Sequence, residues 1–454
     1  MGAFLSLFMA AAFRPRLYFA ADPAFIGVRK VPNSKQIENA SLSDLVTAQC
    51  PTLLKQFRPA WWLTGGHLQT FWSAIGDFTK VDKVEYERTL LRTVDGGTLG
   101  LDFTGPPNSE LLAETTPVIV VLHGLTGGSH ESYVRAILAP ACTTVDRGGL
   151  GYRAVVVNFR GCAGVPLTSP RLYSGGTTDD IRTALMYISS LYPNAPLLGI
   201  GFSLGANVLT RYLAEEGERS RLNAGCVLAS PWDFVANIEA LDSTLFRRVV
   251  YSRTLGQNLV TLANRHVDAL AKFPDSPMTA ALPAVRSMNR PLLTEFDQAM
   301  TRLCGGPSPP FPFPSARDYY VWASSHNLLP KIRVPLLAIN AADDPLVPRL
   351  PVDTDRYTLS PWVVFSVTAE GGHLGWFEKD NSSRFGVKRW ITKPVLEWMQ
   401  LMGEVAVDTR RMIPLRQADG FTKEEGRDDI GYLQVEGGGH VVGVEDQDGL
   451  LAGL

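Results

Sequence analysis

The chain has 454 residues, of which 45% are hydrophobic and 19% are charged. This composition is ordinary for a globular protein and allows a large core, in one big domain with an insertion or in two domains. The formal net charge of -2 argues against the broad basic surface that a nucleic acid partner requires. Five scattered cysteines without a Cys-x-x-Cys spacing favour reduced, buried thiols over disulfides or a zinc site.

The first residues leave the cellular location open. Residues 2–13 are apolar but too short to cross a bilayer, which takes about 20 residues, and no basic stretch precedes them as in a secretory signal. Residues 1–6 fit the loose pattern for myristoylation of Gly2, although a single acyl chain anchors a protein only marginally. We therefore expect a cytoplasmic protein, with peripheral contact to a membrane or lipid droplet as an open alternative.

Predicted strands alternate with predicted helices over most of the chain. The strands are expected at residues 86–92, 99–103, 118–122, 154–158, 197–200, 226–229, 334–339 and 362–367. Helices between them are expected at residues 178–191 and 207–216. Continuous apolar strands separated by helices predict an α/β protein whose mostly parallel central sheet has helices on both faces.

About 100 residues separate the strand that ends near Ser230 from the strand that starts at Val334. Since one crossover helix needs far fewer, we expect an inserted helical lid. The polar end of the chain, where the apolar pattern fades, predicts disorder. The expected divisions are a lead-in segment packed on the core at residues 1–82, the first part of the core at 83–233, the lid at 234–333, the second part of the core at 334–402 and a polar, disordered tail at 403–454.

Ser203 is the predicted nucleophile. It is the centre of a Gly-x-Ser-x-Gly motif that follows a buried strand and precedes a helix. A nucleophile in such a turn needs small residues two positions before and after it, here Gly201 and Gly205, because the backbone turns sharply. The motif also arises by chance, and the competing interpretation is that Ser203 only caps the helix. The strand-turn-helix context favours the nucleophile.

A serine hydroxyl needs a base to accept its proton, and in this order of elements the base follows the serine. Four histidines follow Ser203. His266 and His326 fall in the expected lid, and His440 falls in the expected tail. His373 lies in a Gly-Gly-His-Leu-Gly loop directly after the last predicted strand, so it is the predicted base.

The acid that orients the histidine should follow the strand between the serine and the histidine. Two adjacent aspartates, Asp343 and Asp344, occupy that position. A carboxylate there accepts the second imidazole N–H and stabilises the imidazolium. We favour Asp344, whose Asp-Pro-x-x-Pro context resembles the acid loop of many hydrolases of this kind, and Asp343 remains the alternative.

The loop that begins at His123 follows the apolar strand 118–122 and resembles a His-Gly oxyanion loop in position and composition. The predicted oxyanion donors are the backbone amides of Leu125 and Leu204. One well-placed donor contributes about 3 to 4 kcal/mol of transition-state stabilisation. His123 itself is expected to support this loop from beneath.

Three further polar residues have two interpretations each. Arg160 follows a strand at the same sheet edge, where it either binds an acidic substrate group or forms a salt bridge that braces a loop; the bracing role is favoured. His67 and Gln69, in the lead-in segment, either line the substrate pocket or hold this segment against the core. The sequence does not decide between these last two roles.

Taken together, these motifs resemble the AB hydrolase 4 family, which includes YheT-like hydrolases and the yeast medium-chain fatty acid ethyl ester synthase/esterases. The matching segments are residues 62–63, 67–70, 123–125, 158–162, 201–207, 343–345 and 371–376. The resemblance covers about residues 50–402. It implies an α/β-hydrolase fold and a triad of Ser203, Asp344 and His373 that acts on acyl esters. The membrane anchor of many animal members has no counterpart in the short N-terminal apolar stretch.

These residues predict a serine ester hydrolase of the esterase or lipase type, acting on medium-chain or acylglycerol-like esters through an acyl-serine intermediate. The main alternative is an acyl-CoA:alcohol O-acyltransferase that uses the same triad. The second alternative is a binding module of the same fold without activity. Neither a metal nor a cofactor is implied, and the expected partners are an acyl ester, or an acyl-CoA and an alcohol.

Overall fold

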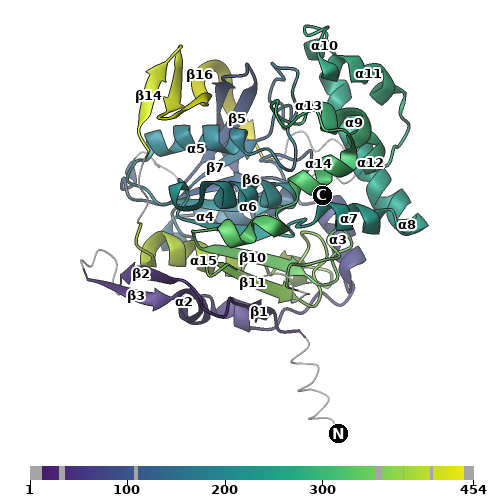
Figure 1. Cartoon of the computed structure of the whole chain (residues 1–454). Coiled ribbons are helices and arrows are strands. Elements are labelled where there is room, and N and C mark those ends of the chain that lie inside the picture. The colour runs from purple at the N-terminus through teal and green to yellow at the C-terminus, as the bar shows by residue number, and fades with distance from the viewer. Residues whose placement is uncertain are drawn as a thin grey trace.

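A computed structural model describes residues 13–29, 36–106, 111–352, 360–381, 383–408 and 413–443 (Figure 1). Gly2 and the pattern for its myristoylation lie outside the described residues. The centre of the molecule is a 12-stranded sheet. Its strands lie in the order β1 (Arg16–Tyr18), β11 (Val363–Thr368), β10 (Leu336–Ala341), β9 (Ala224–Leu228), β8 (Leu197–Phe202), β6 (Val118–Leu122), β7 (Arg153–Asn158), β5 (Thr98–Thr104), β4 (Glu85–Thr93), β16 (Arg427–Val442), β15 (Phe421–Glu424) and β14 (Leu415–Ala418).

The middle of the sheet, from β7 to β11, is parallel. Every residue of these strands is buried, as expected for strands that helices cover on both faces. β5 and β4 continue the sheet in antiparallel fashion. The predicted mostly parallel α/β architecture is confirmed.

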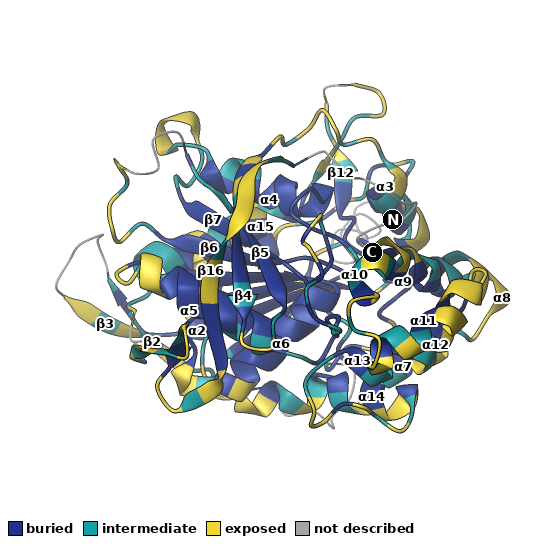
Figure 2. Cartoon of the chain, turned by 90° about the horizontal axis from the view of Figure 1, so that it is seen from above, coloured by how far each residue is buried: buried dark blue, intermediate teal, exposed yellow. Residues whose placement is uncertain are grey.

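Helices cover both faces of the sheet and fill two apolar clusters. On one face lie α5 (Asp179–Leu191) and α6 (Leu204–Glu216). On the other lie α2 (Leu42–Gln49), α4 (Ser132–Cys142) and α15 (Thr392–Gln400), which η8 (Leu401–Val405) continues. Figure 2 shows the buried strands in dark blue between these layers. Short 3-10 turns, η3 (Val145–Arg147) and η4 (Gly217–Arg219), complete the connections.

The segment between β9 and β10 is helical and forms a layer of its own at the right of Figure 1. It is held largely by a separate apolar cluster that includes Leu259, Met278 and Phe296. Its elements are α7 (Phe234–Leu241), α8 (Leu245–Arg247), η5 (Arg248–Ser252), α9 (Arg253–Arg265), α10 (Val267–Leu270), α11 (Pro277–Ser287), α12 (Leu293–Phe296), η6 (Asp297–Thr301), α13 (Arg302–Cys304), α14 (Ala316–Ala323) and η7 (His326–Lys331).

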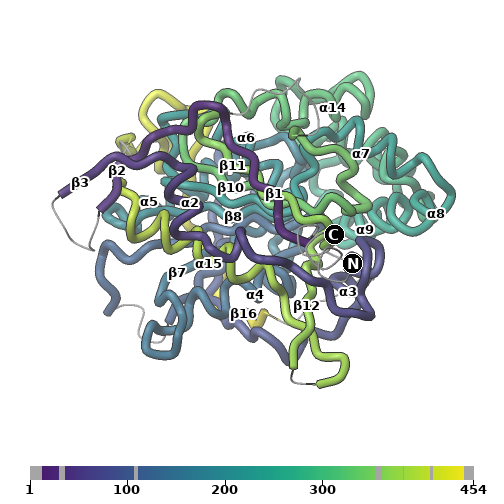
Figure 3. Tube along the Cα trace, turned by 90° about the horizontal axis from the view of Figure 1, so that it is seen from below, coloured from purple at the N-terminus to yellow at the C-terminus, as the bar shows by residue number. Residues whose placement is uncertain are grey.

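The lead-in segment runs along the side of the molecule that Figure 3 shows in purple. Its elements besides α2 are β1, the hairpin of β2 (Phe25–Arg29) and β3 (Ile37–Ser41), η1 (Pro51–Leu54) and α3 (Gly66–Ile75). β1 pairs with β11 at the edge of the main sheet. Thr52 of η1 donates from its backbone amide and its hydroxyl to Glu397 of α15. A two-stranded sheet of β12 (Phe377–Lys379) and β13 (Val387–Arg389) adjoins it.

The expected disorder of residues 403–454 is wrong for most of this segment. β14, β15 and β16 extend the sheet, and β16 pairs with β4 over most of its length. The reason is that two apolar side chains of β16, Ile430 and Tyr432, are buried in the main core although Asp429 and Leu433 beside them are exposed. A mostly polar sequence can therefore still extend the sheet. A buried ion pair between Arg221 and Glu424, 2.8 Å long, fixes the extension to the domain.

The described part of the chain contains no helix that is long and apolar enough to cross a bilayer. All five cysteines are buried and unpaired, so the interpretation of the thiols is confirmed. Burial raises the pKa of the Cys304 thiol to about 12, which keeps it protonated near neutral pH.

Candidate active site

Ser203 lies in the sharp turn between β8 and α6, with backbone angles φ 47° and ψ -117°. A residue other than glycine in this region is strained by about 1 to 3 kcal/mol, and such strain is typical of functional turns. The turn leaves no room for a side chain at either of the glycines two positions from Ser203. A Cβ at Gly201 would lie 2.6 Å from the Cα of Ala206, and a Cβ at Gly205 would lie 2.5 Å from the backbone oxygens of Leu122 and His123.

The structure brings the three predicted catalytic side chains together. The Ser203 hydroxyl is 2.8 Å from His373 Nε2, and His373 Nδ1 is 2.8 Å from Asp344 Oδ2. All three side chains are buried. Ser203 follows β8, His373 follows β11 and Asp344 follows β10. Because these parallel strands end at the same edge of the sheet, the three side chains meet although they are far apart in the sequence.

The two adjacent aspartates have different partners. Asp344 Oδ1 accepts hydrogen bonds from the amides of Leu346 and Val347, at 2.8 and 3.1 Å, which leaves Oδ2 for the histidine. Asp343 instead accepts from the amide of Gly372 at 2.9 Å. Burial raises the pKa of the Asp343 carboxyl to about 6. The geometry therefore couples Asp344 to His373 and gives Asp343 a place in the turn beside it.

Helix α3 supports the histidine loop, a contact that the sequence did not predict. The amide of His373 donates to the hydroxyl oxygen of Thr70 at 2.9 Å, and that hydroxyl donates to the carbonyl of Gly66 at 2.6 Å. A Cβ at Gly66 would lie 1.9 Å from the carbonyl oxygen of Asp343. The lead-in segment therefore contacts both loops that carry the base and the acid. The two glycines at the start of α3 were the signal in the sequence for this close approach.

His123 lies beneath the loop after β6. Its Nδ1 donates to the carbonyl of Gly124 at 2.7 Å, and its Nε2 accepts from the amide of Phe159 at 3.1 Å. Burial lowers the pKa of His123 to about 3, so its imidazole is neutral, as this pair of bonds requires. His123 thus braces the loop, as its position in the sequence predicts.

The amides on either side of Leu125 are both occupied. The amide of Gly124 donates to the phenol oxygen of Tyr133 at 3.0 Å, and the amide of Thr126 donates to the phenol oxygen of Tyr173 at 2.8 Å. Leu204 is the first residue of α6, where an amide has no partner within its helix. Within the described residues, neither the Leu125 nor the Leu204 amide donates a hydrogen bond. Their role as oxyanion donors stays a prediction.

Arg160 and Gln69 have structural partners. Arg160 is buried and pairs with Asp180 and Asp95, both at 2.7 Å, so it braces loops instead of presenting a free charge. Gln69 is also buried, and its amide nitrogen donates to the carbonyl oxygens of Leu63 and Phe377. Gln69 therefore holds the lead-in segment against the core.

His67, in contrast, faces the helical segment after β9. Its Nδ1 is 2.6 Å from the phenol oxygen of Tyr251 in η5, and the two rings stack. Burial and, to a smaller extent, the charge of Arg247 lower the pKa of His67. Asp344 in turn raises the pKa of Tyr251, after the larger effect of burial, which places this phenol near the triad. Sequence reasoning did not single out Tyr251.

The other three histidines that follow Ser203 lie elsewhere. His266 Nε2 donates to the carbonyl of Gly161 at 2.8 Å, and His326 Nδ1 donates to that of Trp232 at 3.0 Å. His440 was set aside because of the expected disorder, which is wrong. His440 lies in β16, where its Nδ1 is 3.3 Å from Oε1 of the exposed Glu87 in β4, and it therefore does not belong to the candidate site.

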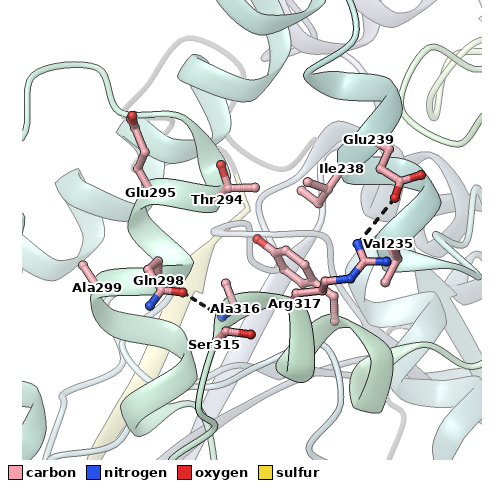
Figure 4. Close-up of a pocket in the computed structure, with 11 residues that line it drawn as sticks. Val235, Ile238, Glu239, Thr294, Glu295, Gln298, Ala299, Ser315, Ala316 and Arg317 are labelled. Atoms are coloured by element: carbon pink, nitrogen blue, oxygen red, sulfur yellow. Dashed lines mark hydrogen bonds and ion pairs between the residues drawn. The ribbon is translucent and has the colours of Figure 1, made fainter.

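A cavity of about 640 Å³ opens between α7, α12, η6 and α14, away from the triad (Figure 4). Its walls are mostly apolar and include Ile238 and Tyr320, and an ion pair of Arg317 with Glu239 lies at its edge. None of its lining residues belongs to the triad or the predicted oxyanion donors. Elsewhere too, the residues that the structure describes contain no cluster of three or more histidine, cysteine and acidic side chains suited to a metal ion.

Comparison with known proteins agrees with this geometry. The chain is 32% identical to a monoacylglycerol lipase of Saccharomyces cerevisiae, over 75% of this chain and 79% of the relative. It is 29% identical to the medium-chain fatty acid ethyl ester synthase/esterase 2 of the same yeast, over 82% and 91%, and 30% identical to the human phospholipase ABHD3, over 80% and 84%. A family model described as the alpha/beta hydrolase fold matches residues 117–380. The chain therefore belongs to the α/β-hydrolase fold family.

Proposed function

We propose that the protein hydrolyses carboxylic esters of fatty acyl chains, with Ser203 as the nucleophile, His373 as the base and Asp344 as the acid. The observation that carries this proposal is the buried hydrogen-bonded chain from Asp344 through His373 to the Ser203 hydroxyl, with both links at 2.8 Å. A hydrolase of the esterase and lipase type fits the printed functions of the relatives, which are a lipase, an ester synthase/esterase and a phospholipase.

The geometry supports a two-step reaction. His373 Nε2 accepts the proton of Ser203 as the serine oxygen attacks the ester carbonyl, while Nδ1–H donates to Asp344. The amides of Leu125 and Leu204 would stabilise the oxyanion. Collapse of the tetrahedral intermediate breaks the ester C–O bond, and His373 returns the proton to the leaving alcohol. Water, deprotonated by the same histidine, then releases the acid from acyl-Ser203.

The surroundings of Ser203 favour an apolar acyl group. Leu125, Leu204 and Phe234 pack with the core cluster beside the turn, and Phe234 comes from the helical segment at residues 234–333, which we propose as the lid. Acyl chains bind in pockets whose walls are apolar with few polar anchors. Esters of such chains partition into membranes and lipid droplets. A cytoplasmic protein in peripheral contact with a lipid surface is therefore part of the proposal.

Acyl transfer to an alcohol is a second candidate, because one relative is named as both an ethyl ester synthase and an esterase. In that reaction an alcohol attacks acyl-Ser203 in place of water, and the acyl donor is an ester or an acyl-CoA. The same triad serves both reactions. The difference between them depends on how well the site excludes water.

The proposal is tested with p-nitrophenyl esters of rising acyl length, from about two to twelve carbons. Each buried methylene contributes about 0.8 kcal/mol, so kcat/KM is expected to rise about fourfold per added carbon until the pocket is filled. Product analysis with ethanol and with an acyl-CoA measures transfer against hydrolysis. A series that peaks at acetate would contradict the fatty acyl chain, and full activity of Ser203→Ala would contradict the mechanism.

A further inference from the structure

Helix α3 buries several polar side chains and exposes two apolar ones. Gln69, Thr70 and Ser73 point into the protein and bond to backbone groups around the histidine loop. Its apolar residues Phe71, Trp72 and Ala74 are partly buried against apolar clusters, whereas Leu68 and Ile75 are 46% and 60% exposed. A surface helix normally buries its apolar side chains, so the exposed Leu68 and Ile75 call for an apolar partner.

A second exposed apolar group lies on the neighbouring lid elements. Leu245, Phe246 and Val249 of α8 and η5 are 77%, 50% and 39% exposed. Aromatic contacts join the two groups: the Phe246 ring centroid lies 5.2 Å from that of His67 and 6.5 Å from that of Phe71, both on α3. α8 and α3 lie near one another at the right of Figure 1, and Figure 2 shows much of α8 as exposed. These apolar residues form the α3–α8 face: Leu68, Ile75, Leu245, Phe246 and Val249.

Two arginines adjoin the α3–α8 face. Arg247 and Arg248 follow Phe246 directly, and Arg248 is exposed. Within the described residues, neither guanidinium forms an ion pair. Cations beside an exposed apolar group are complementary to a surface that is apolar inside and negative at its boundary, as an anionic phospholipid layer is.

The α3–α8 face is the outer side of elements that contact the candidate active site. The inner side of α3 holds the histidine loop through Thr70, which accepts from the amide of His373. Tyr251 of η5 bonds to His67 of the same helix. A surface bound to this face would therefore lie beside the elements that frame the triad.

We infer that the α3–α8 face docks the protein onto an anionic phospholipid surface. The exposed side chains of Leu245 and Phe246 insert among the acyl chains, and Arg247 and Arg248 bind headgroup phosphates. The inference rests on the proposed function only in that the docked enzyme takes its ester from the same lipid layer. The docking itself requires no catalysis.

Vesicle flotation tests the docking without turnover. The unlipidated full-length chain carries Ser203→Ala, so that no lipid is consumed, and is mixed with vesicles of phosphatidylcholine with or without phosphatidylserine. We expect binding to the mixed vesicles to fall about tenfold with Leu245→Ser and Phe246→Ser together. Arg247→Gln and Arg248→Gln together are expected to remove the preference for phosphatidylserine and the dependence of binding on salt.

The matched control replaces two apolar residues that are exposed elsewhere, Val145→Ser and Leu191→Ser, and binding should stay unchanged. Hydrolysis of a soluble short-chain ester by the Leu245→Ser, Phe246→Ser variant with an intact Ser203 should stay within about twofold of wild type, which shows that the variant folds. Binding that resists both double variants overturns the inference. The inference is also overturned if the variants convert a dimer into a monomer and leave vesicle binding unchanged, because the face would then join two copies of the chain. Docking that depends on the face in a protein without esterase activity would refute only the proposed function.

Discussion

The sheet edge where β6, β8, β10 and β11 end differs from the proposed lid, the helical segment at residues 234–333, in how its side chains are held. At the edge, Ser203, His373 and Asp344 are buried and joined by hydrogen bonds. The turn that carries the serine has no room for a Cβ at the glycines two positions before and after it. On the lid, Leu245 and Phe246 are exposed. We propose from this difference that the edge carries out the reaction and that the helical segment controls how the ester reaches it.

The cause of this difference is the way each region is built. The strands of the edge form a continuous ladder of hydrogen bonds within a core that is buried on both faces. The elements of the proposed lid have their own apolar cluster, and polar contacts such as the hydrogen bond from Asn207 to the carbonyl of Ala323 tie them to the domain. Substitutions at the edge should therefore affect every substrate, and substitutions on the lid only some.

The largest effect is expected for the acid. Asp344→Asn should lower kcat by about 10⁴, because an amide favours the wrong tautomer of His373. Asp343→Asn is the matched control, and it should cost less than about tenfold because that carboxylate bonds to the turn. Steady-state kinetics on one ester measures both. The opposite ranking would move the acid to Asp343.

The turn around the nucleophile should be almost as sensitive. Gly205→Ala pushes a methyl group against the backbone oxygens of Leu122 and His123, so α6 and the Leu204 amide must shift. A displacement of this kind costs about 10² in kcat. Gly27→Ala in β2 is the control, since its nearest contact is a side-chain atom at 3.1 Å. Equal kinetics of the two variants would show that the turn tolerates movement.

A substitution at the start of the lid should depend on the substrate. Phe234 lies beside Leu204 and Gly175, so Phe234→Ala removes apolar surface near the serine. We expect kcat/KM to fall about fivefold to tenfold for an octanoyl ester and less than twofold for an acetyl ester. The exposed Phe25 provides the control variant Phe25→Ala. A uniform loss for both esters would remove the distinction between lid and edge.

The smallest effect concerns the stability of the edge. The folded-state pKa of Asp343 is raised to about 6 from an ordinary value of about 4, so its contribution to stability is full below pH 4 and is lost as pH rises through 6. Asp343→Asn should therefore gain stability relative to wild type between pH 4 and pH 7.5. The gain should be about 1 kcal/mol, because partial exposure screens the charge. Urea unfolding at both pH values measures it, and a constant or falling difference would contradict it.

Much of the edge could be predicted because its signals are local. Ser203 and His373 each follow a buried apolar strand within a glycine-bordered turn, and Asp344 follows such a strand within a Pro-containing loop. Parallel strands then bring their ends to one side of the sheet, whatever the distance in sequence. The α/β-hydrolase fold is confirmed, whereas the catalytic roles of these residues and the oxyanion donors stay predictions.

Contacts between distant segments could not be predicted in the same way. β16 looks polar and glycine-rich in the sequence because few of its residues are buried, and its ladder with β4 involves residues more than 300 positions away. Thr70 and Tyr251 likewise acquire their roles only when α3 meets the histidine loop and η5. No local period indicates such partners.

The most direct measurement is covalent labelling of the chain with a fluorophosphonate, followed by mass spectrometry of the modified peptide. Such a probe reacts with a serine that a neighbouring histidine activates. The account predicts one adduct on Ser203, its absence in Ser203→Ala and a much slower reaction in His373→Ala, with all three proteins folded. An adduct on another serine, or labelling of Ser203→Ala at the wild-type rate, would contradict the central claim.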